Sequence, residues 1–126
     1  VTRRGQGGLA MELQLTFEKG MATVKTENAI RKVLSPTKRT LGEPIYLQRK
    51  SAEAMTGNAM LPSGFFAVKE MKNAEGKLTG VALYGGGNGH GVGLSQYGTK
   101  YLAEQGKTAA EIIACYFPGT KVEKVL

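Results

Sequence analysis

The chain has 126 residues, of which 41% are hydrophobic and 21% are charged, as is ordinary for one globular domain. Its formal net charge of +7 favours anionic partners such as nucleic acid, acidic lipid or a wall polymer, but the basic pairs are scattered, which fits a solvated surface better. A single Cys excludes an intrachain disulfide, and no apolar run is long enough to span a membrane.

The start of the chain has neither a Met nor an apolar segment that could serve as a signal peptide. We therefore expect a processed or truncated piece of a longer protein. On that interpretation the missing signal says nothing about export.

The first third of the chain predicts a hairpin followed by a short helix. Residues 9–17 alternate between apolar and polar side chains, which is typical of a half-buried strand. Residues 18–20 form the expected turn, and residues 21–25 return as a second strand. Thr26 can cap the N-terminus of a helix that ends at Ser35-Pro36.

Residues 36–60 have a weaker pattern, and we expect a loop excursion there, with a short strand possible only at 45–47. A second hairpin follows, with strands at 65–71 and 77–84 joined by a turn at 73–76. Its second strand leads directly into a Gly-rich run.

The last third predicts two helices. Residues 94–105 have helical spacing with Gly106 after the end, and Thr108 with Glu111 fits a capping box for a helix that Pro118-Gly119 ends. We expect Cys115 to pack in the core beside the apolar side of that helix, and residues 122–126 to form a final strand. The fold class is therefore α+β: antiparallel β-hairpins forming a sheet or small barrel with short helices, two of them near the C-terminus.

Residues 85–98 combine the Gly-rich run with the only His of the chain. Six of the nine residues 85–93 are Gly, which permits positive φ and a close approach of the backbone to another surface. No Gly-x-Gly-x-x-Gly register fits and no Gly-Lys-Ser/Thr follows, which argues against nucleotide binding. Tyr97 stands where a nucleophile elbow around Ser95 needs Gly.

Metal binding is disfavoured as well, because one His and one Cys cannot make a structural zinc site. We therefore expect no metal and no cofactor. His90 has two open interpretations. Its imidazole either holds the Gly-rich loop in shape through backbone hydrogen bonds or lines a site, and the flanking glycines, which shield it little, favour the site.

With these residues laid out, the chain resembles the stage II sporulation protein D and amidase-enhancer family of bacterial cell-wall proteins. Residues 85–99 match its pattern Gly-x-Gly-x-Gly-His-Gly-Val-Gly-Met-Ser-Gln-x-Gly-Ala, with Leu94 for Met and Thr99 for Ala. Similar stretches follow within 103–120. Residues 29–34 and 61–66 resemble the family's helix with a Leu-Arg dipeptide and its Leu-x-Ser-x-x-Phe stretch.

This resemblance implies a role in peptidoglycan remodelling. Members of the sporulation branch are lytic transglycosylases that cleave glycan strands, and others are described as enhancers of cell-wall amidases. The implied location is the bacterial cell envelope, outside the cytoplasm. The implied partners are peptidoglycan glycan strands together with the N-terminal half of the same domain or a cell-wall amidase.

The family's catalytic Glu lies in an earlier segment that has no counterpart here. Cleavage of a glycosidic bond needs a carboxylic acid whose pKa is raised by an apolar pocket. Glu12, Glu104 and Glu111 are better explained as strand-surface, helix-surface and capping residues. We therefore identify no catalytic residue, and expect residues 1–126 to be a single domain or the C-terminal part of the family domain, inactive when isolated.

The resemblance and the residue types together give a candidate site that forms one side of a glycan groove. The substrate-binding candidates are Asn88, His90, Ser95, Gln96 and Tyr97, and the loop-shaping candidates are Gly87, Gly89, Gly91 and Gly93. A non-catalytic wall-binding module that stimulates an N-acetylmuramoyl-L-alanine amidase is the alternative. A nucleic-acid-binding domain is disfavoured, because no motif interleaves basic and aromatic residues.

Overall fold

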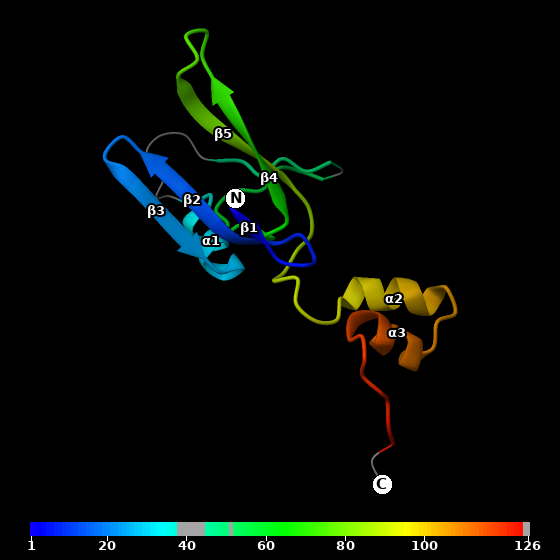
Figure 1. Cartoon of the computed structure of the whole chain (residues 1–126). Coiled ribbons are helices and arrows are strands. Elements are labelled where there is room, and N and C mark those ends of the chain that lie inside the picture. The colour runs from blue at the N-terminus through cyan, green and yellow to red at the C-terminus, as the bar shows by residue number, and fades with distance from the viewer. Residues whose placement is uncertain (38–44, 51, 125–126) are drawn as a thin grey trace. The chain divides into compact units, whose positions relative to one another are not determined.

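The computed structural model describes residues 1–37, 45–50 and 52–124. The chain divides into two compact units, Val1–His90 (unit 1) and Gly91–Leu126 (unit 2), and each is described by itself. Both are shown in Figure 1. The mixture of antiparallel strands with short helices confirms the predicted α+β class.

Unit 1 contains two antiparallel sheets and one helix. The first sheet has the order β1-β2-β3, and the second is a hairpin of β4 and β5. The described residues form no closed barrel, so of the two predicted arrangements only the sheets are found. The elements are β1 (Arg3–Arg4), β2 (Ala10–Phe17), β3 (Gly20–Lys25), α1 (Glu27–Val33), β4 (Phe66–Lys72) and β5 (Leu78–Gly85).

The strands of each hairpin pair in an antiparallel register. In the β2–β3 pair Leu13 lies opposite Val24, and in the β4–β5 pair Val68 lies opposite Leu83. Both predicted hairpins are confirmed. Strand β1 was not predicted, because two consecutive arginines have no apolar alternation; they pair with β2 through the backbone.

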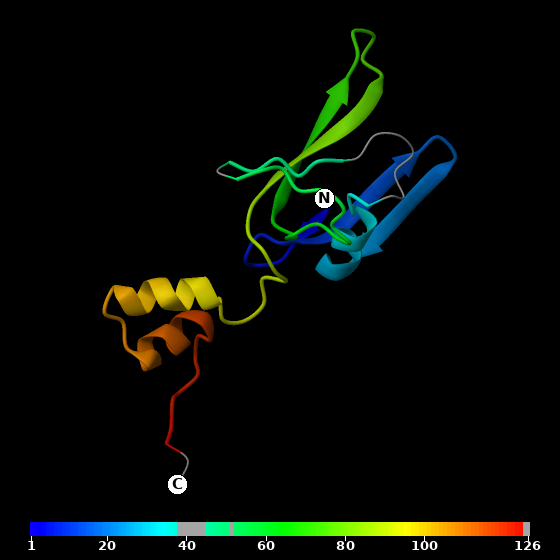
Figure 2. The same ribbon diagram turned by 180° about the vertical axis from the view of Figure 1, so that it is seen from behind.

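The core of unit 1 lies where α1 packs against β2 and β3, as Figure 2 shows from behind. Ile30 of the helix is fully buried. Thr26 caps α1 as predicted, since its Oγ1 accepts a hydrogen bond from the Ala29 amide at 3.3 Å. The buried apolar side chains are Ala10, Leu13, Ile30, Leu61 and Phe66.

The segment before β4 is mostly irregular, as predicted. The possible strand at 45–47 is not formed: Leu47 makes an isolated antiparallel bridge with Met55 instead, through two backbone hydrogen bonds of 2.8 and 3.1 Å. Part of this predicted excursion, residues 38–44 and 51, lies outside the described residues.

Unit 2 contains two helices, α2 (Gln96–Glu104) and α3 (Ala109–Tyr116), which pack on each other. Helix α2 begins two residues later than predicted, because Ser95 is its N-cap. The capping box at the start of α3 is confirmed, with Thr108 and Glu111 each accepting from the other's backbone amide. These interactions with Thr108, followed by the hydrogen bond from Lys107, lower the pKa of Glu111 to about 2.

Two expectations for unit 2 are wrong. Cys115 is exposed rather than packed in a core. The reason is that two short helices bury only a narrow stripe of side chains, and Ile112 is the one buried residue among positions 91–124. The predicted final strand is also missing, since residues 121–124 form no strand and residues 125–126 lie outside the described part.

Candidate functional site

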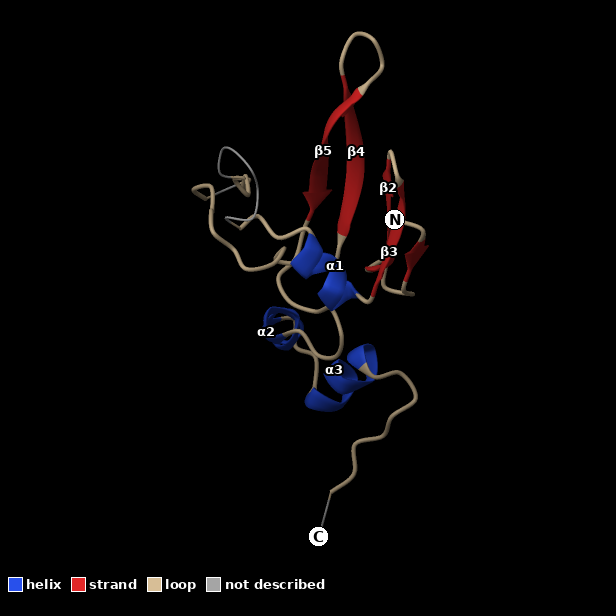
Figure 3. Cartoon of the chain, turned by 90° about the vertical axis from the view of Figure 1, so that its left-hand side faces the viewer, coloured by secondary structure: helices blue, strands red, loops and turns tan. Residues whose placement is uncertain are grey.

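A groove of about 1180 Å³ lies on unit 1. Strand β5 forms one side of it, and the segment that precedes β4, described over residues 45–50 and 52–65, forms the other. Figure 3 shows that this segment lies on the β5 side of the hairpin. The Gly-rich run enters the lining through residues 85–88. The lining residues fall within 31–36, 45–50, 55, 58–63, 65–66 and 81–88. We refer to this hollow as the groove.

Three aromatic side chains in the groove lining are unusually exposed. Tyr46, Phe65 and Tyr84 keep 55%, 51% and 62% of their surface accessible. Exposed rings beside amide groups suit a ligand that has apolar faces and hydroxyl edges, because the rings stack and the amides hydrogen-bond. The amide side chains in the same lining are Gln48, Asn58 and Asn88.

Arg31, a buried residue of the groove lining, holds the neighbouring backbone in place. It is only 8% exposed, and its Nε donates to the Leu61 carbonyl at 2.8 Å while its Nη2 donates to the Pro62 carbonyl at 3.1 Å. Its Nη1 pairs with Glu27 one helical turn earlier, at 3.2 Å. Arg31 therefore fixes the backbone that enters β4, and its charge is already neutralised by a carboxylate.

The Gly-rich run is attached to that same backbone. The amide of Gly89 donates to the Pro62 carbonyl at 2.9 Å, and Gly89 forms a parallel bridge with Ser63. Before it, the amide of Gly86 donates to Phe65 at 3.1 Å. The first part of the run is thus held in place by hydrogen bonds along residues 62–65.

All four glycines that were predicted to shape the loop adopt positive φ. The values are 85° at Gly87, 119° at Gly89, 71° at Gly91 and 81° at Gly93. A side chain with a Cβ rarely adopts such angles, so a substitution at these positions strains the backbone. Their role in binding a ligand remains a prediction.

The five predicted substrate-binding residues fall in two different units. Asn88 lines the groove, and His90 is exposed at the end of unit 1. In unit 2, the Oγ of Ser95 accepts from the Gly98 amide at 3.1 Å as a helix cap. Gln96 begins α2 and is exposed, and Tyr97 is 87% exposed. Of the five predicted residues, Asn88 is the one that lines the groove.

Carboxylates do not enter the groove lining in the part of the chain that is described. The sequence has no Asp, so every acidic side chain is a Glu. Lys72 lowers the pKa of Glu70 by a hydrogen bond and by its charge, and Glu111 is shifted in the same direction. A general acid needs the opposite shift. Further interactions bind Glu12 to Thr2, Glu27 to Arg31 and Glu104 to Lys100.

Cations do enter the lining. Arg49 and Lys50 belong to it, on the same segment as Tyr46. Sequence reasoning did not assign Tyr46, Arg49 or Lys50 to a site, since residues 36–60 have no periodic pattern. It also did not assign Arg31, Phe65 or Tyr84, because a predicted helix or strand does not by itself show which side chains face a groove. The one available signal was composition: two basic residues follow an aromatic within four positions.

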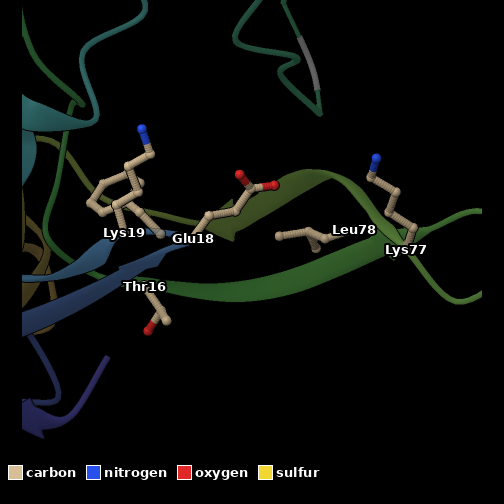
Figure 4. A pocket seen from close by; sticks show the side chains of 6 residues that line it. Thr16, Glu18, Lys19, Lys77 and Leu78 are labelled. Carbon is tan, nitrogen blue, oxygen red and sulfur yellow. The ribbon is translucent and has the colours of Figure 1, made fainter.

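A second hollow lies between the tips of the two hairpins and shares no residue with the groove. Its volume is about 660 Å³. Figure 4 shows Glu18 between Lys19 and Lys77, with Leu78 beside them. No predicted site residue belongs to it.

The described residues contain no group of three or more His, Cys, Asp or Glu side chains that could hold a metal ion. Among the same residues, no helix has the length and apolar character needed to cross a membrane.

Comparison with known proteins gives several curated relatives. Stage II sporulation protein D of Bacillus amyloliquefaciens is 50% identical over 38 residues, which are 30% of this chain and 11% of that protein. The protein of the same name from Bacillus subtilis (strain 168) is 47% identical over the same shares. The amidase enhancer of Bacillus subtilis (strain 168) is 36% identical over 66 residues, 52% of this chain and 8% of that protein.

The matched segments thus span about a tenth of the length of these relatives. No protein-family model matches the chain, and no solved structure matches it significantly. The relatives nevertheless carry the two names that the sequence pattern predicted. The matches confirm the resemblance: the chain is a relative of the stage II sporulation protein D and amidase-enhancer proteins.

Proposed function

We propose that the chain is part of a bacterial peptidoglycan-remodelling protein of the cell envelope, and that its groove binds a glycan strand. The observation that carries the proposal is the groove itself. It places exposed aromatic rings and amide side chains beside the Gly-rich run that carries the family resemblance. In the intact protein this surface forms one side of a glycan-cleaving site.

The composition of the lining supports a sugar polymer over other ligands. A glycan strand presents alternating apolar ring faces and hydroxyl edges, which match Tyr46, Phe65 and Tyr84 together with Asn58 and Asn88. Backbone groups of residues 85–88 add further donors and acceptors, because glycines leave the main chain accessible there.

Cleavage of the strand requires a carboxylic acid that the described residues do not place in the groove. We propose that the whole protein is a lytic transglycosylase whose acid comes from outside these residues. One carboxyl group first protonates the glycosidic oxygen, so that the bond to the leaving sugar breaks. As a carboxylate it then takes the proton of the sugar's own hydroxyl, which bonds to the anomeric carbon and forms the anhydro product. In this scheme residues of the present chain bind and orient the strand.

The first experiment measures binding by the chain as it stands. Purified sacculi should retain it, and soluble glycan strands should bind with an affinity that falls about tenfold or more in Tyr84→Ala. Lys77→Ala is a matched control, because Lys77 is an exposed residue of the other hollow. Equal affinities for the two variants would contradict the proposed groove.

The second experiment separates cleavage from binding. The longer protein should release anhydro-muropeptides from sacculi, whereas the 126-residue chain should bind sacculi and release none. A longer protein that binds sacculi but releases no product would rule out the transglycosylase.

A second candidate is a wall-binding module that stimulates an N-acetylmuramoyl-L-alanine amidase. The match to the amidase enhancer favours it, since that match covers half of this chain. It predicts that adding the protein accelerates peptide release by a purified amidase, without glycan cleavage. Unchanged amidase rates at saturating protein would exclude this candidate.

A further inference from the structure

Among the described residues, the charged side chains that line the groove are all cationic. The lining contains three of them, Arg31, Arg49 and Lys50, and no carboxylate from the described part of the chain. Arg31 is paired with Glu27 and donates to two backbone carbonyls, so its charge is not available to a ligand. The cationic character that a ligand would meet therefore comes from Arg49 and Lys50, which are both exposed.

We propose that Arg49 and Lys50 form an anion-recognition subsite of the groove, so that it selects a wall polymer bearing anionic groups over a neutral one. This inference rests on the proposed glycan-binding function and narrows it. The subsite adds a charge requirement to a surface that would otherwise bind any glycan through its rings and amides.

The position of the two cations supports a built subsite. They follow Leu47, whose amide and carbonyl both form hydrogen bonds with the backbone of Met55. The chain two residues before Arg49 is therefore fixed to a later part of the same segment. Tyr46 precedes Leu47 and also lines the groove. Tyr46, Arg49 and Lys50 thus line the same groove from one short stretch of chain, which the Leu47–Met55 hydrogen bonds hold in place.

The chemistry of the two side chains indicates the ligand. A guanidinium group presents a planar pair of donors that fits a carboxylate or phosphate in two-point contact, while an ammonium group supplies a compact charge. Two kinds of wall polymer carry such groups: glycans with carboxylated ether substituents on the sugar, and polyol phosphates. Their shared chemistry is an oxyanion repeated along a polymer.

The test compares three probes of similar length by calorimetry on the 126-residue chain. They are a neutral chitin oligosaccharide, a peptide-free glycan with carboxylated sugars, and a polyol phosphate. At least one anionic probe should bind about tenfold more tightly than the neutral one at about 50 mM salt, and the difference should shrink at about 300 mM. The probe that shows the gain identifies the source of the anion.

The double variant Arg49→Gln/Lys50→Gln should remove this gain, so that its affinity for the anionic probe falls to about its own affinity for the neutral probe. The control Lys19→Gln/Lys77→Gln makes the same change in net charge at the hairpin-tip hollow, outside the groove. If both double variants lose the same affinity for the anionic probe, the overall charge of the protein explains the effect and the proposal is overturned.

The outcomes also separate this inference from the proposed function. Neutral and anionic probes that bind equally well would overturn the anion subsite alone, and glycan binding would stand. Failure of the chain to bind any of the three probes would overturn both.

Discussion

Arg31 and Pro62 are 31 positions apart, and the Nη2 of Arg31 donates a hydrogen bond to the Pro62 carbonyl at 3.1 Å. The same carbonyl accepts from the Gly89 amide at 2.9 Å. One oxygen atom therefore joins the short helix to the Gly-rich run. Within unit 1, hydrogen bonds thus connect three segments that resemble the family: residues 29–34, residues 61–66 and the first part of the Gly-rich signature, residues 85–90.

Replacing Arg31 by Gln should destabilise unit 1 strongly. The change leaves Glu27 without its cation and removes donors from the Leu61 and Pro62 carbonyls, so we expect a loss of about 2–4 kcal/mol in the free energy of unfolding. Urea denaturation followed by circular dichroism measures it. Lys32→Gln removes an exposed charge from the same helix and should change stability by less than about 0.5 kcal/mol.

Two neighbouring glycines should respond differently to substitution by Ala. Gly87 has a φ of 85° and lies near the Ser63 side chain, whereas a Cβ on Gly86 would meet no atom within 4 Å. Gly87→Ala should therefore cost about 1–2 kcal/mol, and Gly86→Ala should be neutral or slightly stabilising. Thermal unfolding of the two variants compares them. A similar cost at both positions would contradict the backbone assignment.

Gly98 lies against Tyr116, which leaves no room for a side chain on α2 at that point. A Cβ there would overlap the Tyr116 hydroxyl, so Gly98→Ala should destabilise the α2–α3 pair despite the better helix propensity of Ala. Adding Tyr116→Phe removes the hydroxyl and should restore most of the loss. Amide exchange in α2 and α3 reports the effect, and a double variant no better than Gly98→Ala would refute it.

Acid should weaken the start of α3. The folded pKa of Glu111 is about 2, below the ordinary value of 4.5, so its stabilisation is present above pH 4.5 and is lost as the pH falls toward 2. Thr108 is the main cause of that shift through its backbone amide. NMR titration should find the Glu111 carboxyl inflection near 2. The Glu111→Gln variant should lose this pH dependence of the α3 amide signals.

The parts of the fold that the sequence predicted are those determined by short-range patterns. Alternation predicted the first strand of the β2–β3 hairpin, and turn residues between two strand-like runs predicted the β4–β5 hairpin. The side chains of Thr26 and Thr108 marked two helix starts, because a cap requires only residues within one turn. Strand β1 was missed since its pairing depends on backbone groups and not on apolar side chains. Cys115 was misplaced because burial depends on how much surface covers a helix, which its own periodicity does not report.

The candidate site was predicted in part. Composition singled out the Gly-rich run, and the family-like signature with its residue types added Asn88, which lines the groove. Tyr46 and Arg49 were not, because they come from an aperiodic segment that only the tertiary arrangement brings to the groove. Arg31 lies in the stretch 29–34 that resembles a helix of the family, but its structural role depends on the carbonyls of residues 61 and 62, which no local pattern indicates.

The single buried side chain of unit 2 has a consequence for how the protein opens. Ser95 and Thr108 cap the N-termini of α2 and α3, but Ile112 is the one buried residue of the pair. Local unfolding of these helices therefore exposes little apolar surface and costs little free energy. Amide hydrogens of α2 and α3 should therefore exchange with solvent long before those of β2 and β3. The last residues of the family-like signature, 96–99, lie in α2 and should therefore be among these rapidly exchanging amides.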